Sequence, residues 1–574
     1  MKDINNSIRL ILFFSIFLSL IFPFEGNSSL KKIKVEDGIL YFEDNTKVNL
    51  FGFNFQPCLS WEHGARMHNQ GVLMPLKARD LKKVTDESFD EIERLGAELI
   101  RVHLMPADFT NDKGDVFDTI WLDTFMYVMA EAQKRGLYVY LTILNHLDHD
   151  GTQFPYNKES FAASFPREDW MVDPDVIMAT ENCIKQLLNH RNPYNGELLK
   201  FHSSLAVIEP INEPSYWWFE KWVDFNKKGN RDKFESWSYQ NTKKYINRIV
   251  DLIRSEGVTQ PIVWNCGWPK LIQKNKAAFN AIADSKVDGV SFCLYPGQSD
   301  LKKPFWKNTE ELSDKNYLPY IKDCAENEDW LGWLYSDSFK NKAKLVYEYE
   351  TFCNQSGYLY PAMAEFFRSV DAQIAAQWTY GLTGYAKYLG GSHVFNLKTT
   401  PKKAASFMVA KKQFKDIQTS YSYKTRSSAV MHDGELIYSG EINFESELLP
   451  SAIIGVGNSP YVEYSGSGLY FIEPDNNGSF YIEIMPDVKF LNPHWKELHT
   501  GDAVVALAEN TSNIFTLKLP GLDDSWVYRK EGHRWELISK SINFPSFNRI
   551  CILYFPSHPS VIFSICAFFM YAQT

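Results

Sequence analysis

Leu205-Ala-Val-Ile-Glu-Pro-Ile-Asn-Glu-Pro214 is an apolar run, rich in β-branched residues, that ends in an amide, a carboxylate and a proline. This pattern predicts a buried strand. Because Pro214 cannot continue the strand, we expect Glu213 at its C-terminal end, where parallel α/β barrels carry their chemistry. An ordinary strand end with a solvated glutamate would show the same tripeptide. The chemistry therefore depends on whether a second carboxylate ends a later strand.

Strand-like and helix-like patterns alternate along most of the chain. Eight strand–helix units over roughly 370 residues match the size of a (β/α)8 barrel, also called a TIM barrel, with long loops. An alternating stretch at 33–50, turning at Asp37-Gly38, predicts a hairpin before the barrel. The predicted barrel strands are 48–55, 97–104, 137–144, 205–211, 261–265, 287–294, 344–348 and 373–378.

Past about residue 420 the pattern changes to short alternating runs separated by Gly, Asn, Asp and Ser. This texture is typical of a small all-β module, and we expect a sandwich. The predicted domains are therefore a barrel at 29–415 and a β-sandwich at 420–538. The tail at 541–574 has one basic and no acidic residue, and its apolar end is too short to span a bilayer. We interpret it as a frameshift or read-through product and assign it no function.

The N-terminus predicts export. Lys2 and Arg9 accompany the apolar run Leu10–Phe22, which is too short for a comfortable membrane span. We expect 1–28 to be a signal peptide, with a short membrane anchor as the alternative. The mature protein would then be secreted, periplasmic or at the cell surface, without stable membrane insertion.

The composition narrows the partners. A formal net charge of −10 argues against nucleic acid and anionic membranes, which attract basic patches. Aromatic residues make up 15% of the chain, and carbohydrate-processing enzymes use exposed rings as platforms for sugar faces. The eight cysteines show no spacing typical of a zinc or redox site, so we expect buried free thiols. Export would permit disulfides, which the sequence alone cannot pair.

A second carboxylate does end a later strand. Val346-Tyr-Glu-Tyr-Glu350 places Glu348 at the end of the seventh predicted strand, and Glu213 falls at the end of the fourth. The pair resembles that of the (β/α)8 glycoside hydrolases whose acid/base and nucleophile lie on strands four and seven, and most of all the cellulase-like family 5. The resemblance covers about residues 33–415. It implies that Glu213 is the general acid/base and Glu348 the nucleophile.

Two carboxyls divide the work of a retaining glycoside hydrolase. One protonates the departing oxygen, and the other, ionised, attacks the oxocarbenium-like centre. Ionised Glu348 is expected to keep Glu213 protonated through like-charge repulsion. The family often has Glu-aromatic-Gly at the nucleophile, but here Glu350 replaces the glycine and rivals Glu348, since residues two apart on a strand point the same way. We prefer Glu348, and we expect Glu209 to make a structural ion pair.

Five further residues match substrate-binding or nucleophile-contacting positions of the family. Arg101 and Tyr295 resemble the arginine and the sixth-strand tyrosine that hydrogen-bond the nucleophile. Asn212 resembles the amide that contacts the substrate's 2-hydroxyl, and Trp378 the tryptophan under the sugar-binding subsite. His146 matches a histidine at the end of the third strand. A structural salt bridge for Arg101 and a core histidine for His146 remain alternatives.

The sequence departs from the family at Cys293. The family usually has a histidine at this position, two residues before the tyrosine, so the cysteine removes one polar contact near the nucleophile and leaves the subfamily open. Trp217, Trp218 and Trp222 follow the acid/base directly. They could extend the cleft as sugar platforms, and packing of a loop is an equally good interpretation.

We therefore predict an exported retaining glycoside hydrolase that needs no cofactor and no metal. The resemblance implies a β-linked polysaccharide or oligosaccharide of β-glucan or β-mannan type, with endo or exo action left open. A metal-dependent hydrolase would need grouped ligands that His103 and His146 do not supply. A Schiff-base aldolase would need a lysine at a strand end, whereas Lys344 begins its strand. The remaining alternative is a non-catalytic carbohydrate-binding protein on a decayed barrel, which would most cheaply have lost a carboxylate.

Overall fold

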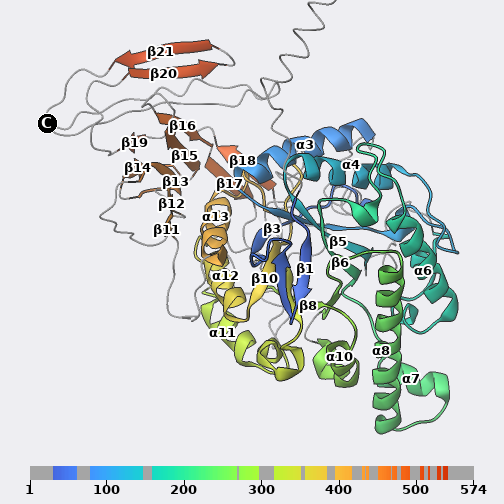
Figure 1. The fold of residues 1–574 in the computed structure, drawn as a ribbon. Coiled ribbons are helices and arrows are strands. Elements are labelled where there is room, and N and C mark those ends of the chain that lie inside the picture. The colour runs from blue at the N-terminus through green and yellow to red at the C-terminus, as the bar shows by residue number, and fades with distance from the viewer. Residues whose placement is uncertain are drawn as a thin grey trace, which may run out of the picture.

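Eight parallel strands form a single sheet in the order β6-β5-β4-β3-β10-β9-β8-β7 (Figure 1). A bridge between Ile208 of β6 and Ile262, just before β7, joins the two outer strands, so the sheet closes into a barrel. This is the predicted (β/α)8 fold, and every strand overlaps the range predicted for it. The strands are β3 (Leu50–Asn54), β4 (Leu99–His103), β5 (Tyr138–Asn145), β6 (Leu205–Asn212), β7 (Val263–Asn265), β8 (Gly289–Leu294), β9 (Ala343–Tyr349) and β10 (Ala372–Gln377).

The computed structural model describes most of the chain between residues 30 and 540. The predicted signal peptide, His146 and the tail at 541–574 lie outside the described residues. None of the described helices is both long and apolar enough to cross a membrane. The described ranges are 30–60, 78–145, 158–267, 270–296, 316–350, 356–383, 395–415, 429–432, 435–438, 450–459, 461–466, 468–474, 480–485, 487–491, 505–509, 515–517, 526–531 and 534–540.

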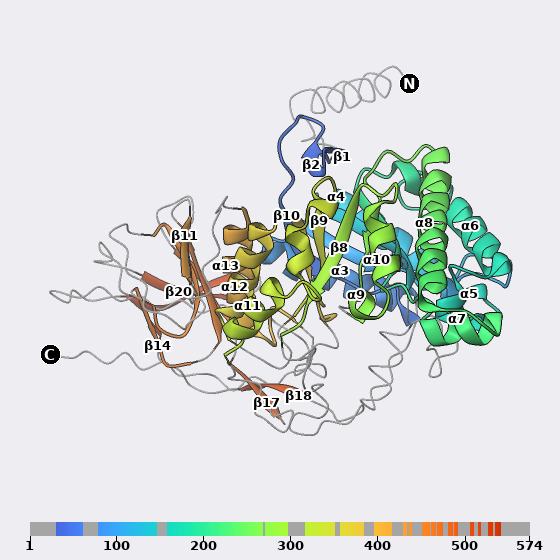
Figure 2. The same ribbon diagram turned by 90° about the horizontal axis from the view of Figure 1, so that it is seen from below.

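Helices surround the barrel (Figures 1 and 2). In two of these helices a capping side chain explains where the helix begins. Thr119 accepts a hydrogen bond from the backbone N–H of Leu122 at the start of α4, and Asp173 caps α6 ahead of Pro174. The α-helices are α3 (Ala78–Arg94), α4 (Ile120–Lys134), α5 (Phe161–Ser164), α6 (Pro174–Leu188), α7 (Phe219–Asn226), α8 (Arg231–Ser255), α9 (Lys270–Lys274), α10 (Lys276–Ala283), α11 (Leu318–Glu326), α12 (Leu359–Ser369) and α13 (Pro401–Lys415). Short 3-10 turns are η2 (Pro106–Asp108), η3 (Arg167–Asp169), η4 (Leu199–Phe201), η6 (Gly332–Tyr335) and η7 (Asp337–Phe339).

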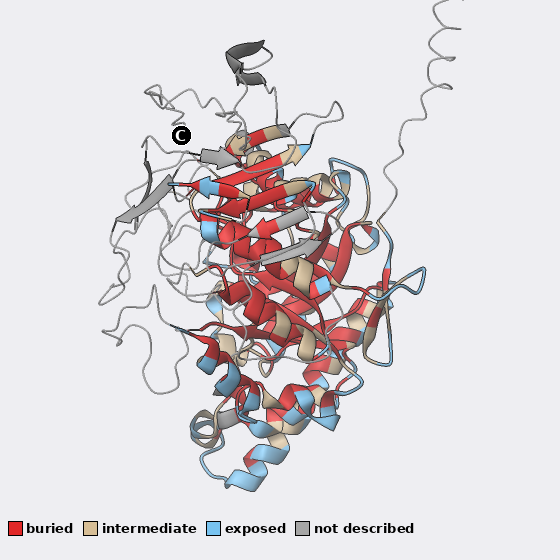
Figure 3. Ribbon diagram, turned by 90° about the vertical axis from the view of Figure 1, so that its left-hand side faces the viewer, coloured by how far each residue is buried: buried red, intermediate tan, exposed pale blue. Residues whose placement is uncertain are grey.

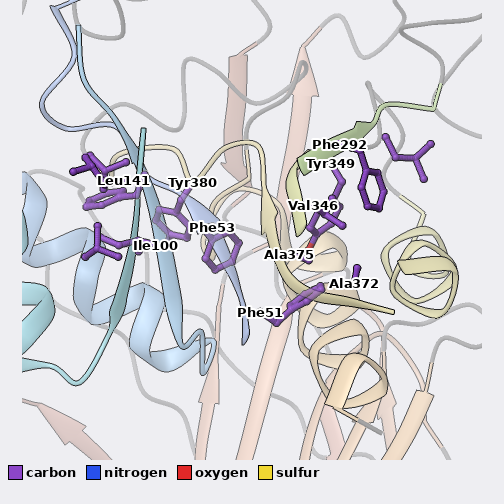
Figure 4. Packing of buried hydrophobic residues seen from close by; sticks show 14 of the residues in the cluster. Phe51, Phe53, Ile100, Leu141, Phe292, Val346, Tyr349, Ala372, Ala375 and Tyr380 are labelled. Atoms are coloured by element: carbon purple, nitrogen blue, oxygen red, sulfur yellow. The ribbon is translucent and has the colours of Figure 1, made fainter. Parts of the chain in front are cut away.

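Alternate residues of the barrel strands belong to two different apolar layers. Phe51 and Phe53 of β3 lie in the layer between barrel and helices, where Phe53 stacks on Phe407 of α13 with ring centroids 4.0 Å apart (Figure 4). Their neighbour Leu50 belongs instead to a cluster drawn from the barrel strands and the N-terminal hairpin, which we call the inner cluster. Burial is accordingly almost complete along the barrel strands (Figure 3).

The predicted hairpin closes one end of the barrel. β1 (Ile33–Glu36) and β2 (Ile39–Phe42) pair around Asp37 and Gly38, which both have positive φ, as a two-residue hairpin turn requires. The Gln373 side chain bonds the backbone N–H and C=O of Leu40, at 2.7 and 2.8 Å. Leu40 belongs to the inner cluster together with residues at the starts of the barrel strands. Figure 2 shows the hairpin of β1 and β2 at the edge of the barrel. The hairpin therefore covers the N-terminal end and leaves the C-terminal end for chemistry.

Among the described residues after α13, all regular secondary structure is β, as the texture of the sequence predicts. One sheet has five strands and three others have two strands each. The larger sheet contains β11 (Ala429–His432), β12 (Glu435–Tyr438), β13 (Ala452–Val456), β15 (Leu469–Pro474) and β16 (Phe480–Ile484). The smaller sheets pair β14 (Val462–Tyr464) with β19 (Phe515–Leu517), β17 (Asp487–Leu491) with β18 (Val505–Glu509), and β20 (Trp526–Glu531) with β21 (Arg534–Lys540).

The five-stranded sheet packs directly on the barrel's helices. Apolar residues of its strands join the same core cluster as α13. Beside this core, Arg94 of α3 bonds both carboxylate oxygens of Glu473 at 2.6 and 2.8 Å and reaches Glu483 at 3.1 Å. Its guanidinium also lies 3.9 Å from the centroid of the Phe471 ring. Arg94 thus links glutamates of two strands, β15 and β16, to the barrel.

The described cysteines are buried free thiols, in agreement with the sequence-based expectation. They are Cys58, Cys183, Cys266, Cys293 and Cys324. Cys353, Cys551 and Cys566 lie outside the described residues.

Replacing Arg94 is expected to weaken the junction between the barrel and the sheet. Arg94→Ala removes a cation–π contact and leaves Glu473 and Glu483 close together without a counter-charge. We expect the free energy of unfolding to fall by about 1–3 kcal/mol in urea titrations followed by circular dichroism. Lys83→Ala is the control, because Lys83 makes a 3.8 Å exposed ion pair with Glu87 and should change stability by less than about 0.5 kcal/mol. Equal stability of the two variants would contradict the assignment.

Candidate active site

Arg101 lies at the centre of the polar residues inside the barrel. It is fully buried on β4. One terminal nitrogen, Nη1, donates to Glu348 Oε1 at 3.0 Å, and the other, Nη2, donates to Asn212 Oδ1 at 2.9 Å and to Glu209. Burial opposes the guanidinium charge, but the charges of Glu209 and Glu348 raise the pKa of Arg101 above its ordinary value. The expected arginine–glutamate contact is therefore present, and Arg101 also fixes the orientation of the Asn212 amide.

Glu209 is a structural carboxylate, as predicted. It is fully buried on β6 and forms an ion pair with Arg101. Hydrogen bonds from three neighbouring strands satisfy it, which a buried carboxylate requires. The further donors are Tyr140 at 2.5 Å, Ser291 at 2.6 Å, Thr142 at 3.1 Å and Asn265 at 3.3 Å. No sequence motif singles out these donors, although each occupies an inward position on a predicted strand.

Glu348 on β9 is held from two sides. Tyr295, just past β8, donates to Oε2 at 2.7 Å, and Arg101 donates to Oε1. Burial and then the Glu213 charge raise the pKa of Glu348, whereas Arg101 and the Tyr295 hydroxyl act against the rise. Glu348 is therefore harder to ionise than a free glutamate, and the two donors limit that cost.

Glu213 follows β6 directly, at the same end of the barrel. Its φ of +46° lies in the left-handed region, which is uncommon outside glycine and is typical of residues held for function. Oε1 accepts a hydrogen bond from the Tyr347 hydroxyl at 2.7 Å. The donor Tyr347 directly precedes Glu348 on β9, so the two glutamates lie at the same end of the barrel. The ends of β6 and β9 thus bring together the two glutamates that the sequence pairs.

Glu350 does not share the environment of Glu348, so the expectation that both would point the same way is wrong. Glu350 is fully buried and forms an ion pair with Lys403 of α13 at 2.8 Å. Tyr360 of α12 donates to both of its oxygens, at 2.9 and 2.8 Å. The register of β9 is irregular, and the strand ends at Tyr349, so simple alternation does not extend to Glu350. Its contacts with two helices make it a structural carboxylate.

Trp378 directly follows β10, at the same end of the barrel as the glutamates. It belongs to the inner cluster together with Tyr295, and its ring centroid is 5.1 Å from that of His103. His103 also contacts Arg101 and lies 3.6 Å from Glu348 Oε1. From sequence, His103 entered only as a possible metal ligand. Its position two residues after Arg101 on the same strand is the signal that would have placed it here.

The tryptophans that follow Glu213 belong to two environments. Trp217 and Trp222 are buried in a cluster with Phe234, and Trp217 donates to Asp169 at 2.6 Å. Of the two interpretations left open, loop packing holds for this pair. Trp218 is partly buried.

No group of three or more His, Cys, Asp or Glu side chains in the described part of the chain is arranged to hold a metal ion.

Neutralising Glu350 is expected to destabilise the fold. Glu350→Gln leaves the buried Lys403 ammonium without a counter-charge, which should lower the free energy of unfolding by about 3–5 kcal/mol. The double variant Glu350→Gln/Lys403→Met should regain most of that loss, since it removes the unpaired charge. Urea unfolding measures both effects, with Glu326→Gln as the control because Glu326 pairs with Lys322 on an exposed helix face. A double variant no more stable than Glu350→Gln would contradict this role.

No protein-family model matches the sequence, and no curated protein matches it. Among solved structures, the chain is similar to the endo-1,4-β-mannanase from Rhizomucor miehei, with 14% identity and a TM-score of 0.44 over 67% of this chain and 100% of that one. It is similar to the endo-β-1,4-mannanase from Thermotoga petrophila, with 11% identity and a TM-score of 0.44 over 83% and 95%. A third is the glycoside hydrolase family 5 mannosidase from Rhizomucor miehei, with 13% identity and a TM-score of 0.45 over 67% and 98%. At such identities the function of this chain has to be argued from its own site.

Proposed function

We propose that this protein is a retaining glycoside hydrolase that cleaves β-linked polysaccharides or oligosaccharides, with Glu213 as general acid/base and Glu348 as nucleophile. One observation carries the proposal: two glutamates at the ends of β6 and β9 share a site in which Arg101 and Tyr295 hold one of them. A pair of carboxyls with different surroundings is what glycoside hydrolysis requires. The presence of both glutamates argues against a non-catalytic binding protein.

The proposed first step breaks the glycosidic bond. Glu213 gives its proton to the departing oxygen while a carboxylate oxygen of Glu348 attacks the anomeric carbon. The electron pair of the broken C–O bond leaves with the departing hydroxyl. Arg101 and Tyr295 favour the ionised form of Glu348 and hold it in the orientation needed to attack the sugar. In the second step Glu213 takes a proton from water, which displaces Glu348 and restores both carboxyls. Two inversions give net retention at the anomeric carbon.

Asn212 and Trp378 are the proposed sugar-binding residues. Arg101 fixes the Asn212 amide beside Glu213, where it can meet the hydroxyl next to the reacting carbon. Trp378 supplies an apolar ring at the same end of the barrel, suited to a sugar face. We further propose export, from the N-terminal pattern, and a substrate of β-glucan or β-mannan type. His146, from the same resemblance, remains a proposed substrate-binding residue.

The proposed activity is tested with a panel of β-mannans, β-glucans and aryl β-glycosides. Product sizing separates endo from exo action, and proton NMR of the first-formed anomer should show retention. Glu348→Gln should lose at least about a thousandfold in kcat on every substrate. Glu213→Gln should lose activity on polysaccharide but keep turnover of an activated aryl glycoside, which azide should accelerate. Glu326→Gln is the surface control, and an inverted product or an active Glu348→Gln protein would refute the mechanism.

The acidic limb of the pH profile is expected to depend on Tyr295. Activity requires ionised Glu348, so kcat/KM falls as the pH drops through the pKa of Glu348. The Tyr295 hydrogen bond lowers that pKa. Tyr295→Phe should therefore move the acidic limb of kcat/KM to higher pH, by about one unit. An unchanged acidic limb would contradict the contact's role.

A further inference from the structure

Tyr347 and Glu348 are consecutive residues of β9 that lie on the same side of the sheet. Successive strand residues normally point to opposite faces. Here Val346 pairs with Phe292 and Glu348 with Cys293, so Tyr347 has no partner residue in β8 and forms a local bulge. Bulges of this kind re-aim side chains and are frequent beside active sites. Tyr347 accordingly belongs to the inner cluster, next to the residues that hold Glu348.

The hydroxyl of Tyr347 connects β9 to Glu213. It donates to Glu213 Oε1 at 2.7 Å, and its side chain is completely buried. Cys293 of β8 belongs to the same buried cluster as Tyr347. A phenol has one proton to donate, and here that proton is directed at Glu213. Tyr347 thus connects the strand that carries Glu348 to Glu213.

Tyr347 and Cys293 both stay protonated. Burial raises the pKa of both Tyr347 and Cys293 well above their ordinary values. Neither therefore exchanges a proton with Glu213 at working pH, and the phenol remains a fixed donor.

We propose that Tyr347 is the positioning residue of Glu213, donating to Oε1 so that Oε2 carries the proton delivered to the leaving oxygen. The inference rests on the proposed function. In the first step the Oε2 proton moves to the glycosidic oxygen as its bond to the anomeric carbon breaks and the bond to Glu348 forms. The negative charge left on Glu213 is stabilised by the Tyr347 hydroxyl. In the second step the same oxygen takes the proton of the attacking water.

The experiment compares Tyr347→Phe on two leaving groups. On unactivated oligosaccharides, kcat/KM should fall about ten- to hundredfold, because departure of a sugar hydroxyl needs a well-placed proton. On a dinitrophenyl glycoside, which departs without protonation, kcat/KM should stay within about twofold of the wild-type value. The alkaline limb on oligosaccharides should move to higher pH, since deprotonated Glu213 loses a donor. Tyr295→Phe, in contrast, moves the acidic limb.

Tyr349→Phe is the matched control. Tyr349 is also fully buried on β9, and its hydroxyl has no hydrogen-bond partner among the described residues. Removing this hydroxyl should leave kcat/KM on both substrates, and both limbs of the pH profile, unchanged. Cys293→Ala is the second variant: it keeps the phenol but removes a side chain from the buried cluster around it, and should show a smaller loss with the same dependence on leaving group.

The outcomes separate this inference from the proposed function. Equal losses of Tyr347→Phe on both substrates, or wild-type kinetics on both, overturn the inference while wild-type activity and the Glu213→Gln pattern still support the hydrolase. If Tyr347→Phe does not fold, a Cys293→Ala protein with no dependence on leaving group overturns it. A wild-type protein that hydrolyses none of the substrates ends both proposals.

Discussion

The buried charge of Arg101 is the constraint on which the site depends. A guanidinium inside a barrel loses its hydration, and only carboxylates with good hydrogen-bond geometry can compensate. Glu209 provides one, and the Tyr140 and Ser291 hydroxyls satisfy it in turn. Glu348 provides the other, at the end of the barrel where substrate would arrive. Arg101 thereby links the packing of the barrel interior to the orientation of the proposed nucleophile.

The contrast between Glu348 and Glu350 shows how surroundings assign roles to one residue type. Both are buried glutamates near the end of β9. Lys403 and Tyr360, both on helices, bond Glu350 and leave it a structural function. Glu348 is bonded by Arg101 and Tyr295, inside the barrel and beside Glu213. A carboxylate next to a second carboxyl is electrostatically costly, and such a cost is usual where proton transfer is the function.

Much of this arrangement follows from local sequence. Apolar runs that end in polar residues located the barrel strands, and the fourth and seventh runs located the two glutamates. The environment of Glu350 could not be predicted, because Lys403 lies 53 residues further along the chain and its helix had to be placed against β9 first. The donors around Glu209 come from three strands, so their meeting depends on barrel register. His146 falls outside the described residues and stays a prediction.

The bulge at Tyr347 explains why sequence periodicity failed at the point of greatest functional interest. In a regular strand only one of Tyr347 and Glu348 would face the barrel interior, whereas here both side chains do. Because Tyr347 has no partner residue in β8, this donor to Glu213 and the proposed nucleophile Glu348 lie on the same face of the sheet. Glu213, directly after β6, has a left-handed backbone conformation that brings its carboxyl to Tyr347 from the other side. Two local departures from ideal strand geometry, one on β9 and one directly after β6, thus orient the two carboxyls, and the Arg101–Glu209 network fills the barrel interior beside them.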